Sequence, residues 1–92
     1  MERATHPWRR DERTLSRSAP GRVVLLGPDG DDPIVLRGTG VALWRALDRP
    51  QSTDELTISL AKEFDANPDA VRSDIEPVLA QLSAAGVLRP VA

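Results

Sequence analysis

The 92-residue chain has no cysteine, no tyrosine and a single histidine, His6. Disulfide bonds and thiolate nucleophiles are therefore excluded, and zinc sites built from nitrogen and sulfur ligands nearly so. Aromatic residues are limited to two tryptophans and one phenylalanine. A chain of this length buries only about 60–65% of the surface that its unfolded form exposes, which predicts one small domain and argues against a deep catalytic cleft.

Long apolar runs are also missing. No stretch approaches the roughly 18 consecutive apolar residues of a membrane span, and no apolar run follows the first six residues, as a secretion signal would require. The hydrophobic content of 40% nevertheless suits a folded domain better than a disordered chain. We therefore expect a cytoplasmic protein that makes no membrane contact.

The net charge of −2 is unevenly distributed. Residues 1–22 carry six basic and three acidic side chains, whereas residues 23–92 carry six basic and eleven acidic ones. A basic arm could contact nucleic acid, but acids are interspersed among its arginines, which favours a solvated tail or strand. We predict a basic arm at residues 1–12 and a domain at residues 13–92, and the sequence leaves open whether the arm is ordered or flexible.

Two short runs rich in β-branched residues predict a β-hairpin. They span residues 22–26 and 33–37, and residues 27–32 between them are dense in glycine, proline and aspartate, as turns are. A stretch near residues 13–17 is the candidate for a third strand beside the first of these. In that arrangement the strand at residues 34–37 lies at an open edge of the sheet.

From residue 38 onward the apolar spacing becomes helical. A first helix is expected to be capped by Thr39 and to end before Pro50. The second begins with a capping-box spacing at residues 52–55, and the third begins at Pro68. Pro77 lies inside the third helix and should bend it.

The expected buried faces follow from the 3.6-residue period. They comprise Gly40, Leu43, Trp44 and Leu47, then Leu56, Leu60, Ala61 and Phe64, and finally Val71, Ile75, Val78, Leu82 and Ala85, with Leu79 at the border. Ile58 falls off its face, so the arm covers it or it is an exposed contact. With Val87 and Leu88 as a short extended end, the order predicts an α+β, winged-helix-like fold: a three-stranded antiparallel sheet followed by three helices.

The motifs that could carry chemistry favour structural roles. Residues 38–40, Gly-Thr-Gly, lack the GxxxxGK[ST] pattern of a phosphate loop and indicate a tight strand-to-helix turn. The aspartates at positions 29, 31 and 32 lack the spacing of a calcium loop. No nucleophile–base pair can be assembled from the residues present. We therefore predict no catalytic residue, no metal site and no cofactor.

The charges of the two later helices bear on nucleic-acid binding. Lys62 stands among four acids in the second helix, and Arg72 among three in the third. Such faces repel phosphates, which disfavours direct DNA recognition. The open strand edge can instead accept a peptide as an added strand, or it can be covered by the arm or by a second copy of the chain. The residues alone leave these alternatives open.

Residues 35–47, VLRGTGVALWRAL, resemble the strand-to-helix signature of the PqqD-like family. Members are recognition elements for precursors of RiPPs, the ribosomally synthesised and post-translationally modified peptides. The resemblance covers about residues 33–89 and continues through residues 52–56, Leu60, Phe64, Asp74, Ile75, Leu79, Leu82 and residues 86–88. It implies a non-catalytic chaperone that binds the leader segment of a precursor peptide and presents it to a modifying enzyme, such as a radical SAM enzyme or a leader peptidase, in RiPP or peptide-derived cofactor biosynthesis.

The resemblance also implies where the leader binds. The leader adds antiparallel to the strand formed by Pro33, Ile34, Val35, Leu36 and Arg37, in a groove between that strand and the third helix. The positions that match the groove wall are Val71, Asp74, Ile75, Val78 and Leu82, with Gln81 at the rim. Asp74 is expected to pair with a lysine or arginine of the leader. Pro77 departs from the family pattern, and a bend there would reshape the groove.

Two other functions remain as alternatives to peptide presentation. One is a winged-helix regulator that acts through protein contact or through weak DNA binding by the arginine-containing arm. The other is a structural subunit that forms a homodimer through its edge strand. Salt dependence separates the first from strand addition, because counterion release makes DNA affinity fall steeply with salt.

Overall fold

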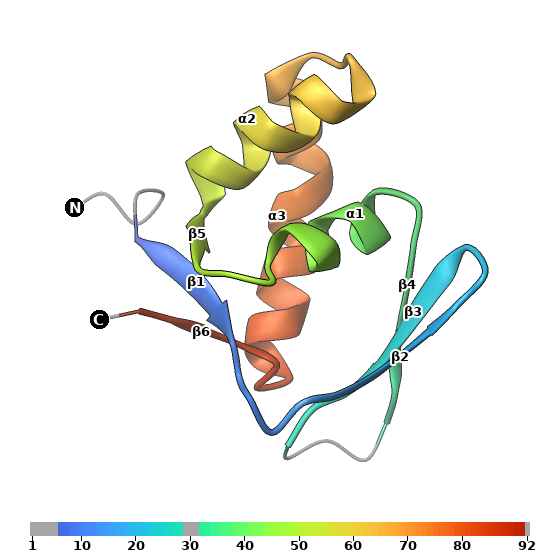
Figure 1. Ribbon diagram of the computed structural model, residues 1–92. Coiled ribbons are helices and arrows are strands. Elements are labelled where there is room, and N and C mark those ends of the chain that lie inside the picture. Colours follow the sequence, from blue (N-terminus) through green and yellow to red (C-terminus); the bar gives the residue numbers. More distant parts are fainter. Residues whose placement is uncertain (1–5, 29–31, 92) are drawn as a thin grey trace.

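The computed structural model describes residues 6–28 and 32–91. In this part of the chain, two three-stranded sheets accompany three helices (Figure 1). The elements run in the order β1 (Pro7–Arg10), β2 (Leu15–Ala19), β3 (Arg22–Leu26), β4 (Ile34–Arg37), α1 (Thr39–Ala46), β5 (Gln51–Ser52), α2 (Thr53–Phe64), α3 (Pro68–Ala84) and β6 (Leu88–Pro90).

One sheet has the order β2-β3-β4, with both pairs antiparallel. This confirms the predicted hairpin, the α+β class and the edge position of the strand at residues 34–37. The first strand lies at Leu15–Ala19, two residues later than expected. Of the predicted turn between β3 and β4, residues 29–31 fall outside the part that the structure describes.

The other sheet, β5-β1-β6, has no counterpart among the predictions. Its central strand is β1, in which Trp8 lies opposite Gln51 on one side and Pro90 on the other. Residues 7–10, whose order the sequence left open, therefore form a strand that is paired along both edges. Charge alone indicated a solvated segment, whereas the strands that order it come from much later in the chain.

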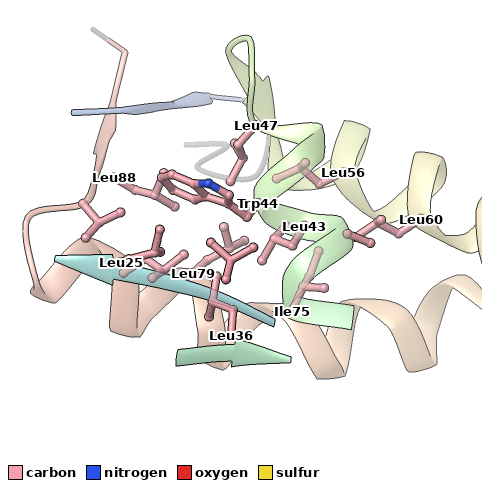
Figure 2. Packing of buried hydrophobic residues seen from close by; sticks show 14 of the residues in the cluster. Leu25, Leu36, Leu43, Trp44, Leu47, Leu56, Leu60, Ile75, Leu79 and Leu88 are labelled. Carbon is pink, nitrogen blue, oxygen red and sulfur yellow. The ribbon is translucent and has the colours of Figure 1, made fainter. Parts of the chain in front are cut away.

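The hydrophobic core lies between the β2-β3-β4 sheet and the helices (Figure 2). Val23 and Leu25 of β3 alternate with less buried neighbours, as expected of a strand with one face on a core. The other fully buried large side chains are Leu43, Leu47, Leu56, Leu60, Ile75, Leu82 and Val87. The buried faces predicted for the helices are thus correct for most of their residues.

The helix starts test the predicted caps. Ser52 and Glu55 form the reciprocal capping box of α2, and Asn67 caps α3 with Pro68 at its first position. Thr39 does not cap α1, because Gly38 occupies the cap position with φ +55° and no side chain caps the helix. That φ lies in the left-handed region, which glycine adopts without the strain that a side chain causes.

Two details of the buried helical faces differ from the predictions. Phe64 is 47% exposed, because α2 ends there and its last turn extends past the core. On α3, Leu79 is buried and Val78 is only half-buried, the reverse of the expected order. Helix α3 continues unbroken through Pro77. Ile58 is 59% exposed.

Contacts of three arginines fix β1 and the segment that follows it. The Arg10 guanidinium lies 4.0 Å from the centroid of the Trp44 ring and donates a hydrogen bond to the Trp44 carbonyl. The Asp11 carboxylate is buried and accepts hydrogen bonds from the Arg13 side chain at 2.9 and 3.0 Å and from Arg89 Nη1 at 3.3 Å. The hydrogen bonds from Arg13 hold the pKa of Asp11 well below its ordinary value.

None of the described helices combines the length and the apolar character that crossing a membrane demands.

Candidate functional site

Strand β4 lies at the end of its sheet, with β3 on one side. Within the described residues no strand pairs with its other side, so that edge presents backbone N–H and C=O groups to a partner. The turn into α1 holds the strand in place, because Gly40 packs against Leu36. A Cβ built on Gly40 would lie 3.3 Å from the Cβ of Leu36. This close approach supports the interpretation of residues 38–40 as a tight strand-to-helix turn.

The two faces of β4 differ in character. Ile34 and Leu36 point toward the helices, with Leu36 in the core and Ile34 half-buried beside it. Val35 and Arg37 point to the other face and are exposed, as is Pro33 just before the strand. A strand added to this edge would meet Ile34 on the helix side and Val35 on the outer side, because side chains alternate along a strand.

The residues predicted on α3 divide into two groups. Val71, Ile75 and Leu82 are 5%, 1% and 0% exposed and belong to the core, as Leu36 does on β4. Their side chains support the site from beneath and do not reach its surface. Asp74 and Gln81 are exposed and Val78 is half-buried. These three follow the i, i+4, i+7 spacing of one helical face and border the buried stripe.

This face of α3 combines an apolar side chain with polar neighbours. Val78 is half-buried and packs against the core, and the exposed Asp74 and Gln81 flank it on the same face. No ion pair involves Asp74 in the described part of the chain, so its carboxylate is available to a cation from a partner. Of the predicted site residues, those that reach the surface are thus Pro33, Ile34, Val35 and Arg37 at β4 and Asp74, Val78 and Gln81 on α3.

An ion pair between α3 and α2 fixes the orientation of α3. Arg72 donates a hydrogen bond to the Asp54 carboxylate of α2, and this bond raises the pKa of Arg72. Arg72 also lies 3.9 Å from a carboxylate oxygen of Glu76. The helix that carries Asp74 and Val78 is thereby tied to α2 as well as to the core.

Comparison with known families identifies the chain. Residues 22–88, which include β3, β4 and all three helices, match the family model described as "Coenzyme PQQ synthesis protein D (PqqD)". The chain belongs to the PqqD family. The resemblance inferred from residues 35–47 and their downstream motifs is confirmed. Comparison with curated proteins finds no significant match.

Two solved structures are similar to this PqqD-family chain over most of its length. One is the solution structure of the PqqD truncation of Methylobacterium extorquens PqqCD, described as a functional, stand-alone RiPP recognition element; it is 25% identical, covers 97% of this chain and 99% of its own, and has a TM-score of 0.72. The other is TbiB1 in complex with the TbiA(beta) leader peptide, at 20% identity, 91% and 98% coverage and a TM-score of 0.77.

The sequence motifs did not single out Trp8, Arg10 or Asp11, which join β1 to the rest of the fold. The Trp8 indole donates a hydrogen bond to Thr53 Oγ1 at 3.1 Å, and Arg10 stacks on Trp44. The only signal in the sequence was Trp8 next to two arginines, a combination that occurs equally in flexible tails. The side-chain partners of Trp8 and Arg10 lie at least 34 positions away in the sequence. Asp11 has one near partner, Arg13, and one distant partner, Arg89.

Proposed function

We propose that this chain is a RiPP recognition element, which binds the leader segment of a ribosomally synthesised precursor peptide and presents it to a modifying enzyme. The observation that carries the proposal is the unpaired edge of β4 in a chain of the PqqD family. The similarity to a stand-alone recognition element and to a leader-bound protein supports it. The pathway makes either a modified peptide or a peptide-derived cofactor.

Binding by strand addition uses the free edge of β4 and the side chains on its helix-facing side. The leader extends the sheet antiparallel to β4, and its backbone hydrogen bonds supply affinity without regard to sequence. Side chains on the helix side of the leader meet Ile34 and Val78, which selects apolar residues. Asp74 attracts a lysine or arginine of the leader, and Gln81 borders the site.

The chain's own role in this proposal involves no bond making or breaking. It binds and orients the leader, and the partner enzyme, a radical SAM enzyme or a leader peptidase, modifies or cuts the peptide. Both the precursor and its enzyme are made in the cytoplasm, where we place this protein. A DNA-binding regulator gains no support, because family membership points to peptides and the exposed faces of α2 and α3 carry mainly acids.

A backbone-methylation scan of the leader tests strand addition directly. Synthetic leader of the precursor encoded beside this chain is titrated into the protein in a calorimeter, together with peptides that carry one N-methyl group each. In an antiparallel pair, alternate residues direct their N–H groups at the neighbouring strand. We expect methylation at every second position to weaken binding by about tenfold or more, since each removes a backbone hydrogen bond and adds a clash.

The peptides methylated at the intervening positions are the matched controls. They have the same composition and the same added group, but their N–H groups point away from β4, so their affinity should stay near that of the unmodified leader. Equal losses at all positions would show that the leader binds in another conformation. No binding by the unmodified leader would disprove the proposed function itself.

A further inference from the structure

The β2-β3-β4 sheet has a second face, which points away from the helices. Its inner face contributes Val23, Leu25 and Leu36 to the core, and alternation directs the intervening side chains outward. In Figure 1 the helices lie to the left of this sheet. We call the outward-pointing residues the outer face: Leu15, Arg17, Ala19, Arg22, Val24, Leu26, Val35 and Arg37.

One half of the outer face is apolar. Leu15 lies opposite Leu26, and Val24 lies opposite Val35, so the four aliphatic side chains adjoin one another across three strands. Leu15 is 66% exposed and Val35 is 46% exposed. Single exposed aliphatic residues need no explanation, but a contiguous group on a sheet is typical of an interaction surface.

The other half of the outer face is basic. Arg22 lies directly opposite Arg37, and Arg17 lies opposite Val24. All three arginines are exposed, and none forms an ion pair within the described part of the chain. Like charges directly opposite each other destabilise a sheet. The face carries no acidic residue, although the chain as a whole has a net charge of −2.

We infer that the outer face binds an acidic protein surface that also presents apolar side chains, and that this surface belongs to the modifying enzyme. The inference rests on the proposed function for the identity of the partner. Carboxylates beside Arg17, Arg22 and Arg37 would relieve the repulsion between the arginines, and aliphatic contacts would cover Leu15 and Val35. A second copy of this face offers no carboxylates, and a nucleic-acid backbone does not match its aliphatic half.

The position of this surface allows the enzyme and the leader to be bound together. The leader lies in the plane of the sheet beyond β4, whereas the outer face lies across the plane and reaches to β2 at the far edge. Strands of four or five residues, spaced at about 4.8 Å, give this face an area of only a few hundred Å², well below the roughly 800 Å² per partner of a stable complex. The contact is therefore transient, as presentation to an enzyme requires.

Two substitutions on β2 test the inference without touching β4. They are Leu15→Thr, which removes aliphatic surface but places a β-branched strand former on β2, and Arg17→Glu, which reverses one charge. The probe is the purified modifying enzyme encoded in the same gene cluster, titrated against the immobilised full chain. We expect each substitution to weaken enzyme binding by about tenfold while the calorimetric affinity for the synthetic leader stays unchanged.

The matched controls are Ile58→Thr, which also replaces an exposed aliphatic residue by threonine, and Arg49→Glu, which makes the same charge reversal; both positions lie outside the sheet. Both should bind the enzyme as the wild type does. Unchanged enzyme binding by both β2 variants would overturn the inference. So would a dimer that Leu15→Thr dissociates, or binding to vesicles of anionic lipid that Arg17→Glu abolishes. If the wild type binds the enzyme through this face but binds no leader, the inference stands and the proposed function fails.

Discussion

Asp11 is a single residue on which several parts of the fold converge. Its carboxylate accepts hydrogen bonds from Arg13 and Arg89, its backbone N–H donates to Val87, and its carbonyl accepts from the Thr14 N–H. It thus joins the end of β1 to the approach to β2 and to the C-terminal strand. A buried carboxylate is stable only with such partners, and here arginines provide them.

The depressed pKa of Asp11 predicts how stability depends on pH. Because the folded state lowers this pKa, the ionised carboxylate stabilises the fold above its unfolded pKa of about 4, and this contribution is lost as the pH falls below that value. We expect Asp11→Asn to lower the Tm at pH 7. The difference in Tm from wild type should narrow as the pH is lowered from 4 to 2.

The adjacent Glu12→Gln is the control for Asp11→Asn. Glu12 is exposed, and exposed substitutions change stability by no more than about 0.5 kcal/mol. A Tm difference between Asp11→Asn and wild type that stayed constant from pH 7 to pH 2 would show that the ionised carboxylate is not the stabilising form.

At the scale of elements, local signals were sufficient where the determinants are close in sequence. The start of α2 was predictable because Ser52 and Glu55 cap one another, and the start of α3 because Pro68 suits a first helical position. The core face of α3 was predictable only within one position. Val78 and Leu79 are neighbours on the helix, and packing against the rest of the fold decided which one is central.

The capping box of α2 allows a measurable prediction for that element. The Ser52 hydroxyl accepts a hydrogen bond from the Glu55 N–H at 3.0 Å, and the Glu55 carboxylate accepts one from the Ser52 N–H at 2.9 Å. Removing the hydroxyl leaves a helix N–H without its acceptor. We expect Ser52→Ala to lower the free energy of unfolding in urea by about 1 kcal/mol.

Ser59→Ala in the same helix is the matched control for Ser52→Ala. Ser59 is exposed in the interior of α2, where alanine has the higher helix propensity, so this variant should be neutral or slightly more stable than wild type. Equal destabilisation by the two substitutions would mean that the cap hydrogen bonds contribute nothing to the stability of the protein.

At the scale of the whole molecule, β1 is the part that sequence patterns missed and the part that completes the fold. It pairs with β5 and β6, which come from the middle and the end of the chain. Its short sequence, PWRR, shows no alternation of apolar and polar residues, so local periodicity carries no strand signal. The edge strand and the amphipathic third helix were more accessible to prediction, because each is visible locally, although four of the eleven predicted site residues lie in the core.

The two tryptophans report whether β1 unfolds together with the core. Trp8 lies on β1, and Trp44 lies on α1 in the core, so Trp44→Phe leaves a fluorophore on the strand and Trp8→Phe leaves one in the core. Because β1 is paired along both edges and Arg10 stacks on Trp44, we expect one cooperative transition. In each variant the urea midpoint from fluorescence should match that from far-UV circular dichroism. Each variant is compared only with itself, so any loss of stability caused by the substitution does not affect the result. A Trp8 signal that changes at lower urea than the circular dichroism of the same variant would show that β1 unfolds separately, as a flexible arm would.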